Sequence, residues 1–296
     1  MIYYHYTPLR AFSSILQDNP TKDNEICFWA TRYDCFSDKS EYKHGIAKLY
    51  PVLNAFEVQA GLQDDRRIAR FFNPTEVEKA QGLPVPYVVS ISARKDNEFM
   101  WENYADKGQG VVMELEFNNL RGFYGTAPYS IESCIYDSEI SNEELSKLVK
   151  DQCLEMAIAM LVGNKELAIA LLKDNPEAFV RFIAIYLLAF VAPRFKKDEY
   201  IDEEETRVII SSPIKEYNDL LAKMQYPDEL DAMVDEVRKF VDSEKQRPDN
   251  NNSFREIFMP ISVLKRVYVK NAKQKPVVET ILRKKGFDDI PVEVMA

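Results

Sequence analysis

The sequence predicts an α+β fold, with a mixed, mostly antiparallel sheet that is flanked by helices. Strand-like and helix-like segments follow one another without the regular strand–helix–strand alternation of a doubly wound parallel sheet. The 296 residues are 46 % hydrophobic and 12 % aromatic, which is enough apolar material for a full core. We therefore expect a single α+β domain over residues 1–296. It carries an added helical segment at 141–195 and an acidic helical insertion at 213–247.

Short runs of β-branched and aromatic residues predict the strands, beginning with IYYHY at 2–6. The expected strands are 2–6, 25–30, 87–92, 111–117, 129–136, 207–211, 266–269 and 290–294. After the first strand, Thr7-Pro8 suits a helix start, which predicts a helix from Pro8 to Leu16. Gly108 and Gly110 suit the return from a short helix to the strand at 111–117.

Helix signals dominate the second half of the chain. Ser141 and Glu144 form a capping box, and Pro176 suits the start of a new helix, so two or three helices are expected between 141 and 191. The other expected helices are one from about residue 40, 52–72, one within 94–107, a hairpin at 213–247, and 276–285. The HG pair at 44–45 suggests that the helix from residue 40 ends there.

Composition limits the compartment and the partners. The longest uncharged apolar run, Phe182 to Pro193, is shorter than the ~20 residues of a membrane span, so a buried core helix is expected and no membrane partner. The N-terminus lacks a secretory signal pattern, and the four cysteines show no disulfide framework, which predicts the cytoplasm. A net charge of −10 argues against broad nucleic-acid binding.

Histidine is scarce, which restricts metal chemistry. The only two histidines, His5 and His44, have no cysteine at metal-ligand spacing, so no metal site is predicted. His44 suits a surface position. His5 lies in the first strand and faces away from Tyr4 and Tyr6 because side chains alternate. It is either a core or rim histidine that makes one backbone hydrogen bond, or a group that binds a ribose or moves a proton.

A late acidic motif offers the strongest candidate chemistry. In an extended chain Glu203, Glu205 and Arg207 share one face. They form either an ion-paired rim or a polar site in which a carboxylate polarises a substrate hydroxyl and the guanidinium holds an anion. Trp101 and Tyr104 share a helix face at i, i+3, and such a pair belongs either to the core or to a binding site.

Several motifs taken in order resemble a known family. They are YHYT at 4–7, FSDKSE at 36–41, SIS at 90–92, MW-x-x-YAD-x-x-x-G at 100–110 and E-x-E-x-R at 203–207. Together they resemble the large bacterial "domain of unknown function 2971" family across nearly the whole chain. Lys39 and Tyr200 stand where that family tends to have Pro and Trp.

A more distant resemblance is to ADP-ribosyltransferase-like domains, and it implies an NAD-consuming enzyme. It implies NAD as substrate, an unknown macromolecular acceptor or cognate partner protein, and a setting in phage defence or toxin–antitoxin systems. Glu205 or Glu203 would then hold the ribose 2′-hydroxyl and stabilise the oxocarbenium ion, with Arg207 beside them. The residues implied in NAD binding are His5, Tyr6, Tyr33, Tyr42, Trp101 and Tyr104.

Two other functions stay open at this point. A non-catalytic binding or regulatory domain predicts an exposed apolar patch, a buried or paired Glu205, and no open cleft at His5. A metal-dependent nuclease predicts that Asp38, Glu41 and Glu114 or Glu116 lie within ~5 Å of one cation position. The transferase hypothesis predicts that His5 and Glu205 lie within ~15 Å, the reach of one NAD-sized ligand.

Overall fold

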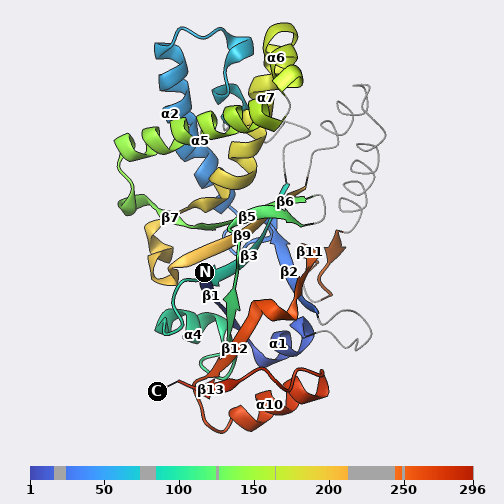
Figure 1. The fold of residues 1–296 in the computed structure, drawn as a ribbon. Helices are drawn as coiled ribbons and strands as arrows, with labels where there is room; N and C mark the ends of the chain where they lie inside the picture. The colour runs from blue at the N-terminus through green and yellow to red at the C-terminus, as the bar shows by residue number, and fades with distance from the viewer. Residues whose placement is uncertain are drawn as a thin grey trace.

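A computed structural model describes residues 1–16, 25–73, 85–124, 127–163, 165–212, 244–248 and 251–295. It confirms the α+β class, with one large, mostly antiparallel sheet and helices packed around it (Figure 1). The strands are β1 (Ile2–Thr7), β2 (Glu25–Arg32), β3 (Val85–Ser92), β4 (Val111–Glu116), β5 (Arg121–Tyr124), β6 (Ala127–Ser133), β7 (Ile135–Tyr136), β8 (Phe195–Lys196), β9 (Glu205–Ser212), β10 (Lys245–Gln246), β11 (Ser253–Pro260), β12 (Leu264–Val269) and β13 (Val292–Val294).

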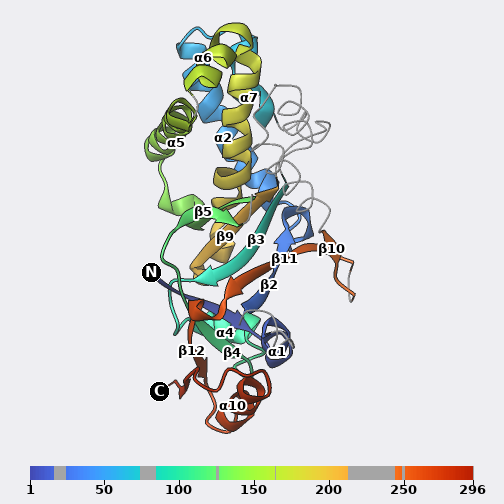
Figure 2. The same cartoon turned by 45° about the vertical axis from the view of Figure 1, so that its right-hand side comes forward.

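The helices gather in two places. They are α1 (Leu9–Ile15), α2 (Glu41–Gln59), α4 (Glu98–Tyr104), α5 (Asn142–Gly163), α6 (Lys165–Asp174), α7 (Pro176–Tyr186) and α10 (Lys275–Lys284). Shorter turns are η1 (Tyr33–Cys35), η2 (Asp64–Arg66), η3 (Ala69–Phe72), η4 (Asp137–Glu139), the π-helical η5 (Leu187–Val191), η6 (Ala192–Arg194), η7 (Asp198–Glu203) and η8 (Ile261–Val263). Figures 1 and 2 show α2, α5, α6 and α7 together at one end of the sheet and α10 at the other.

Strand β3 organises the sheet around the site. Along one edge it pairs with the whole of β9, from Val85↔Ser212 to Ser92↔Glu205. Near its start it pairs with β2, and at its end Ser92 pairs with Tyr4 of β1. Strands β1 and β2 therefore meet different parts of β3, and Ser90 lies between those two contacts.

The two faces of the sheet have separate covers. Helices α1 and α10 cover the face that carries Phe28, Met113 and Val208, which we call the α1 face. The opposite face, called the α4 face, carries Tyr6 and Val112 against α4, and Val88 and Ile209 against η5. Residues in direct register share a face, and neighbours along a strand alternate.

The helical layer, α2 with α5, α6 and α7, has a core of its own around Leu49, Phe179 and Leu187. The apolar run at 182–193 lies in the stretch Pro176–Arg194, which is long and apolar enough to cross a membrane by length and composition. However, 61 % of its most apolar window is buried inside the structure. This agrees with the predicted buried core helix.

Three predictions need correction or fall outside the described residues. The helices expected to end at Gly45 and to span 52–72 are wrong: α2 runs unbroken from Glu41 to Gln59, and short turns follow. Gly45 is needed within α2 because a Cβ there would lie 2.0 Å from the carbonyl oxygen of Ala192. Strands β5, β8 and β11 were not predicted. Of the expected insertion, 213–243 lies outside the described residues, and 245–246 forms β10.

Candidate functional site

Five charged side chains meet on the α4 face of the sheet, at the place where α2, β8, η7 and β9 come together. They are Glu41, Lys196, Glu203, Glu205 and Arg207, each at most 6 % exposed, and we call them the ion cluster. The three predicted residues of the late acidic motif are thus brought together. Sequence reasoning did not include Lys196, and it considered Glu41 only as a metal ligand.

Glu205 is the centre of the ion cluster. Its Oε2 atom accepts hydrogen bonds from Lys196 Nζ at 2.7 Å and from the guanidinium Nη2 of Arg207 at 2.8 Å. Lys196 also donates to Glu203, and Arg207 donates to Glu41 and to the carbonyl of Pro193. The cations therefore alternate with the carboxylates, as buried charges require.

Burial and charge act against each other on the members of the ion cluster. Burial alone would raise the pKa of Glu205, but the charges of Arg207 and Lys196 outweigh it and hold that pKa well below its usual value. Burial would lower the pKa of Lys196, but Glu205 and its fellow carboxylates keep it raised. Burial raises the pKa of Cys134, whose neutral thiol donates weakly to Glu205 at 3.6 Å.

An unusual turn directs the carboxylates to one place. Glu204, between them, has a left-handed φ of 43°, which is uncommon for a residue with a side chain. Its own carboxylate points outward to Arg94, at 2.8 Å. The turn ends η7 and starts β9, so that Glu203 and Glu205 both reach Lys196. Left-handed non-glycine residues cluster at functional sites, where the surrounding structure holds them.

Tyr104 links the ion cluster to the surface. Its hydroxyl donates to Glu203 Oε1 at 2.7 Å, while the residue is 41 % exposed. Burial, and then the charge of Glu203, raises the pKa of Tyr104, so that the hydroxyl stays a donor. Trp101, one turn earlier in α4, is fully buried and packs edge-on against Tyr6.

The aromatic residues predicted to bind NAD do not all lie at the ion cluster, and several pack against other parts of the protein. Tyr6 donates to the backbone of Arg94 and lies beside α4. Tyr42 is buried in the helical layer, where its hydroxyl donates to the carbonyl of Leu188 at 2.9 Å and its ring packs on Tyr33 at 4.3 Å. Of the predicted aromatic residues, Tyr104 contacts the ion cluster directly.

His5 lies on the other face of the sheet. Tyr4, Ser92 and Glu205 are in direct register and share the α4 face, so His5 points to the α1 face, where its ring packs edge-on against Phe28. The backbones of β1 and β9 are about 10 Å apart at this level, because neighbouring strands lie ~4.8 Å apart. His5 and Glu205 thus lie on strands close to each other in the sheet but on opposite faces, so their side chains do not converge.

Ser90 of β3 lies between His5 and the ion cluster. Its carbonyl accepts from His5 Nδ1 at 2.9 Å, and its register partner across the sheet is Arg207. Because Nδ1 donates, Nε2 is the free acceptor of the neutral ring, and burial lowers the pKa of His5 and favours that neutral form. Ser90 itself is exposed although it lies within β3, two residues before the strand ends.

The proposed metal ligands are dispersed. Asp38 pairs with Lys197 at 2.9 Å, Glu114 accepts from the Tyr268 hydroxyl at 2.6 Å, and Glu41 belongs to the ion cluster. Glu116 pairs with Lys265 at the surface. Within the described part of the chain, no group of three or more His, Cys, Asp and Glu side chains is placed to hold a metal ion.

A loop covers the ion cluster. Residues 36–40, between η1 and α2, place the Phe36 ring 5.3 Å from the Arg207 guanidinium. The loop is tied to η7 by Lys197, which contacts Asp38 and the Ser40 hydroxyl, both at 2.9 Å. His44, which was expected at the surface, is half-buried and contacts Asp137 at 3.0 Å.

Part of the chain matches a known family model. Residues 100–208 match the family model described as "Protein of unknown function (DUF2971)". The match supports the DUF2971 family. It runs from α4 into β9 and so includes every member of the ion cluster except Glu41. No curated protein and no solved structure matches the chain.

Proposed function

We propose that this chain is an ADP-ribosyltransferase-like domain of the bacterial cytoplasm that uses NAD to modify a macromolecular acceptor. The observation that carries the proposal is the position of Ser90. It is exposed near the end of β3, accepts a hydrogen bond from His5 through its carbonyl, and pairs with Arg207 across the sheet. A ligand on the α4 face at Ser90 would lie beside Arg207 and the ion cluster, while His5 contacts the same residue from the α1 face.

The charge of the ion cluster suits such a reaction. With all five groups ionised, three carboxylates face two cations, which leaves one excess negative charge in a buried environment. When the bond between the ribose and nicotinamide breaks, its electron pair leaves with nicotinamide, and the ribose carbon becomes cationic. A fixed negative charge nearby stabilises that state, and more so where water is excluded. The acceptor's nucleophile then bonds to the ribose carbon and loses its proton.

Access to the carboxylates requires movement of the loop at 36–40. Glu205 is 3 % exposed, and Phe36 covers Arg207. The ties that hold the loop are ion pairs and hydrogen bonds of Lys197, whose side chain is 36 % exposed, and such exposed contacts are weak. We infer that NAD binds when this loop opens, and that Tyr104 marks the entrance.

Nicotinamide release is the test. Protein is incubated with NAD, alone and with bacterial extract as acceptor, and nicotinamide is measured by chromatography. The variant Glu205→Gln is compared with Glu204→Gln, which makes the same change at the exposed residue just before β9. Release by the wild type and by Glu204→Gln, reduced ~100-fold or more in Glu205→Gln, is expected. No release by folded wild type in either condition would end the proposal.

A second candidate is a non-catalytic binding domain of the same family. It is favoured by the surroundings of Glu205. This carboxylate is buried and accepts hydrogen bonds from Lys196, Arg207 and Cys134. In that case the ion cluster only fastens the helical layer to the sheet. A Lys197→Ala variant separates the candidates, because it loosens the loop without touching Glu205. If this variant also releases no nicotinamide, the binding domain is the better account.

A further inference from the structure

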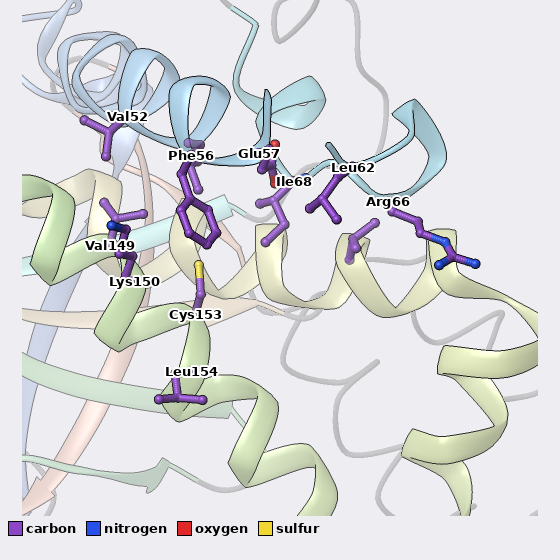
Figure 3. A pocket seen from close by; sticks show the side chains of 12 residues that line it. Val52, Phe56, Glu57, Leu62, Arg66, Ile68, Val149, Lys150, Cys153 and Leu154 are labelled. Atoms are coloured by element: carbon purple, nitrogen blue, oxygen red, sulfur yellow. Dashed lines mark hydrogen bonds between the residues drawn. The ribbon is translucent and has the colours of Figure 1, made fainter. Parts of the chain in front are cut away.

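A pocket of about 320 Å³ lies in the helical layer, away from the ion cluster (Figure 3). Its walls come from α2, the segment 62–68 that contains η2, α5 and α7. The lining is mainly apolar, with Phe56 and Leu62 on one side and Cys153 and Leu154 on the other. A concave apolar pocket of this size accommodates a small ligand or the anchoring side chains of a partner.

The pocket continues into an exposed apolar stripe on α5. Leu154, Ile158 and Leu161 are 60 %, 49 % and 37 % exposed, and their i, i+4, i+7 spacing puts them on one face of the helix. Single exposed apolar residues are ordinary, but a row that leads out of an apolar pocket marks an interaction surface. The pocket and the stripe together, which we call the groove, extend along α5 from Val149 to Leu161, about 18 Å or three helical turns.

Two basic side chains flank the pocket end of the groove, while the exposed Asp151 lies one turn from Leu154 beside the stripe. Lys150 lies over the Phe56 ring at 5.1 Å, and Arg66 is exposed at the far side of the pocket. The one acidic residue in the lining, Glu57, is turned inward. Its two oxygens accept from the backbone N–H groups of Ile68 and Ala69 at 2.6 and 3.0 Å. An occupant therefore meets positive charge beside an apolar floor.

We propose that this groove binds one amphipathic helix of a partner protein, with apolar residues at helical spacing and acidic residues on its flanks. A helix of about three turns matches the length of the groove. Its apolar side chains enter the pocket and cover the stripe, and its carboxylates face Lys150 and Arg66. This is helix-in-groove recognition with charge complementarity, which sets orientation and specificity. The groove is independent of NAD chemistry at the ion cluster.

A display library of 15-residue helical peptides tests this. Three Leu residues at i, i+4 and i+7 are fixed, and the flanking positions are randomised. Peptides are selected on the wild-type protein, and their binding is measured by fluorescence anisotropy. Leu154→Asp disrupts the groove, and Val277→Asp is the matched control: an exposed aliphatic residue, 49 % exposed, on α10 at the opposite end of the molecule (Figure 1).

The expected result is enrichment of acidic flanks and at least ~10-fold weaker binding to Leu154→Asp, with binding to Val277→Asp unchanged. Replacing the flanking acids by Lys in a selected peptide is expected to weaken binding by a similar factor. Basic or neutral flanks, or equal binding to both variants, would overturn the proposal. So would a wild-type dimer in sedimentation that Leu154→Asp dissociates, because the occupant would then be a second copy of this chain.

Discussion

The substitution Glu205→Gln tests how much the ion cluster stabilises the fold. It keeps the shape of the side chain and removes the charge that Lys196 and Arg207 share at 2.7 and 2.8 Å. Both cations keep outer partners: Lys196 keeps Glu203 and, at 3.8 Å, Glu41, and Arg207 keeps Glu41 and the Pro193 carbonyl. The two cations, however, lose the carboxylate that separates them.

Removing one partner from a buried ion pair costs about 3–5 kcal/mol, because the opposite charge stays buried without compensation. We expect the lower part of that range, since both outer partners remain. At ~2–4 °C in melting temperature per kcal/mol, a loss of about 3–4 kcal/mol lowers the melting temperature by roughly 6–16 °C. Thermal unfolding followed by circular dichroism at pH 7 measures it.

Glu204→Gln is the control, because it makes the same chemical change one residue earlier. Glu204 is exposed, and its partner Arg94 lies at the surface, so the melting temperature is expected to stay close to that of the wild type. If Glu205→Gln melts no lower than this control, water reaches the cluster and replaces the lost charge. The description of a sealed, mutually dependent ion cluster would then be wrong.

Three further predictions follow from the same contacts. Because the folded pKa of Glu205 lies below its unfolded value, the free energy of unfolding should fall as the pH drops below ~4.5, and less steeply in Glu205→Gln; denaturant titrations from pH 3 to 7 measure both slopes. Gly45→Ala should destabilise the protein by about 1–3 kcal/mol, because the new Cβ would lie 2.0 Å from the Ala192 carbonyl oxygen. The clash outweighs the ~1 kcal/mol by which alanine is preferred to glycine in a helix. A variant as stable as the wild type would show that the backbone of η6 moves away to make room. Tyr104→Phe should cost about 1–2 kcal/mol through the lost hydrogen bond to Glu203, with equal melting temperatures arguing against that bond.

Local patterns predicted most elements of the fold, and the exceptions have physical causes. Gly45 in α2 suggested a helix end, but it is there because the backbone of η6 lies against it. Strand β11 escaped prediction because its sequence does not alternate between apolar and polar residues. Arg255 in β11 is 2 % exposed and lies over the Tyr87 ring at 4.6 Å, so a charged side chain occupies an interior position.

The candidate site was predictable to the extent that it follows strand alternation. The shared face of Glu205 and Arg207 came from spacing in one strand. The inward position of Lys196 did not, because it adjoins Lys197 in a charged run and nothing local shows which lysine turns inward. The opposite orientation of His5 relative to Glu205 depends on the pairing of β1, β3 and β9, which is a long-range property.

A crystal of the protein soaked with a non-hydrolysable NAD analogue tests the central claim most directly. The proposed function predicts ligand density at Ser90, with the ribose facing Glu203 or Glu205 and Phe36 displaced from Arg207. An empty site at saturating analogue, with Phe36 still over Arg207, would contradict it and would indicate that the ion cluster only stabilises the fold.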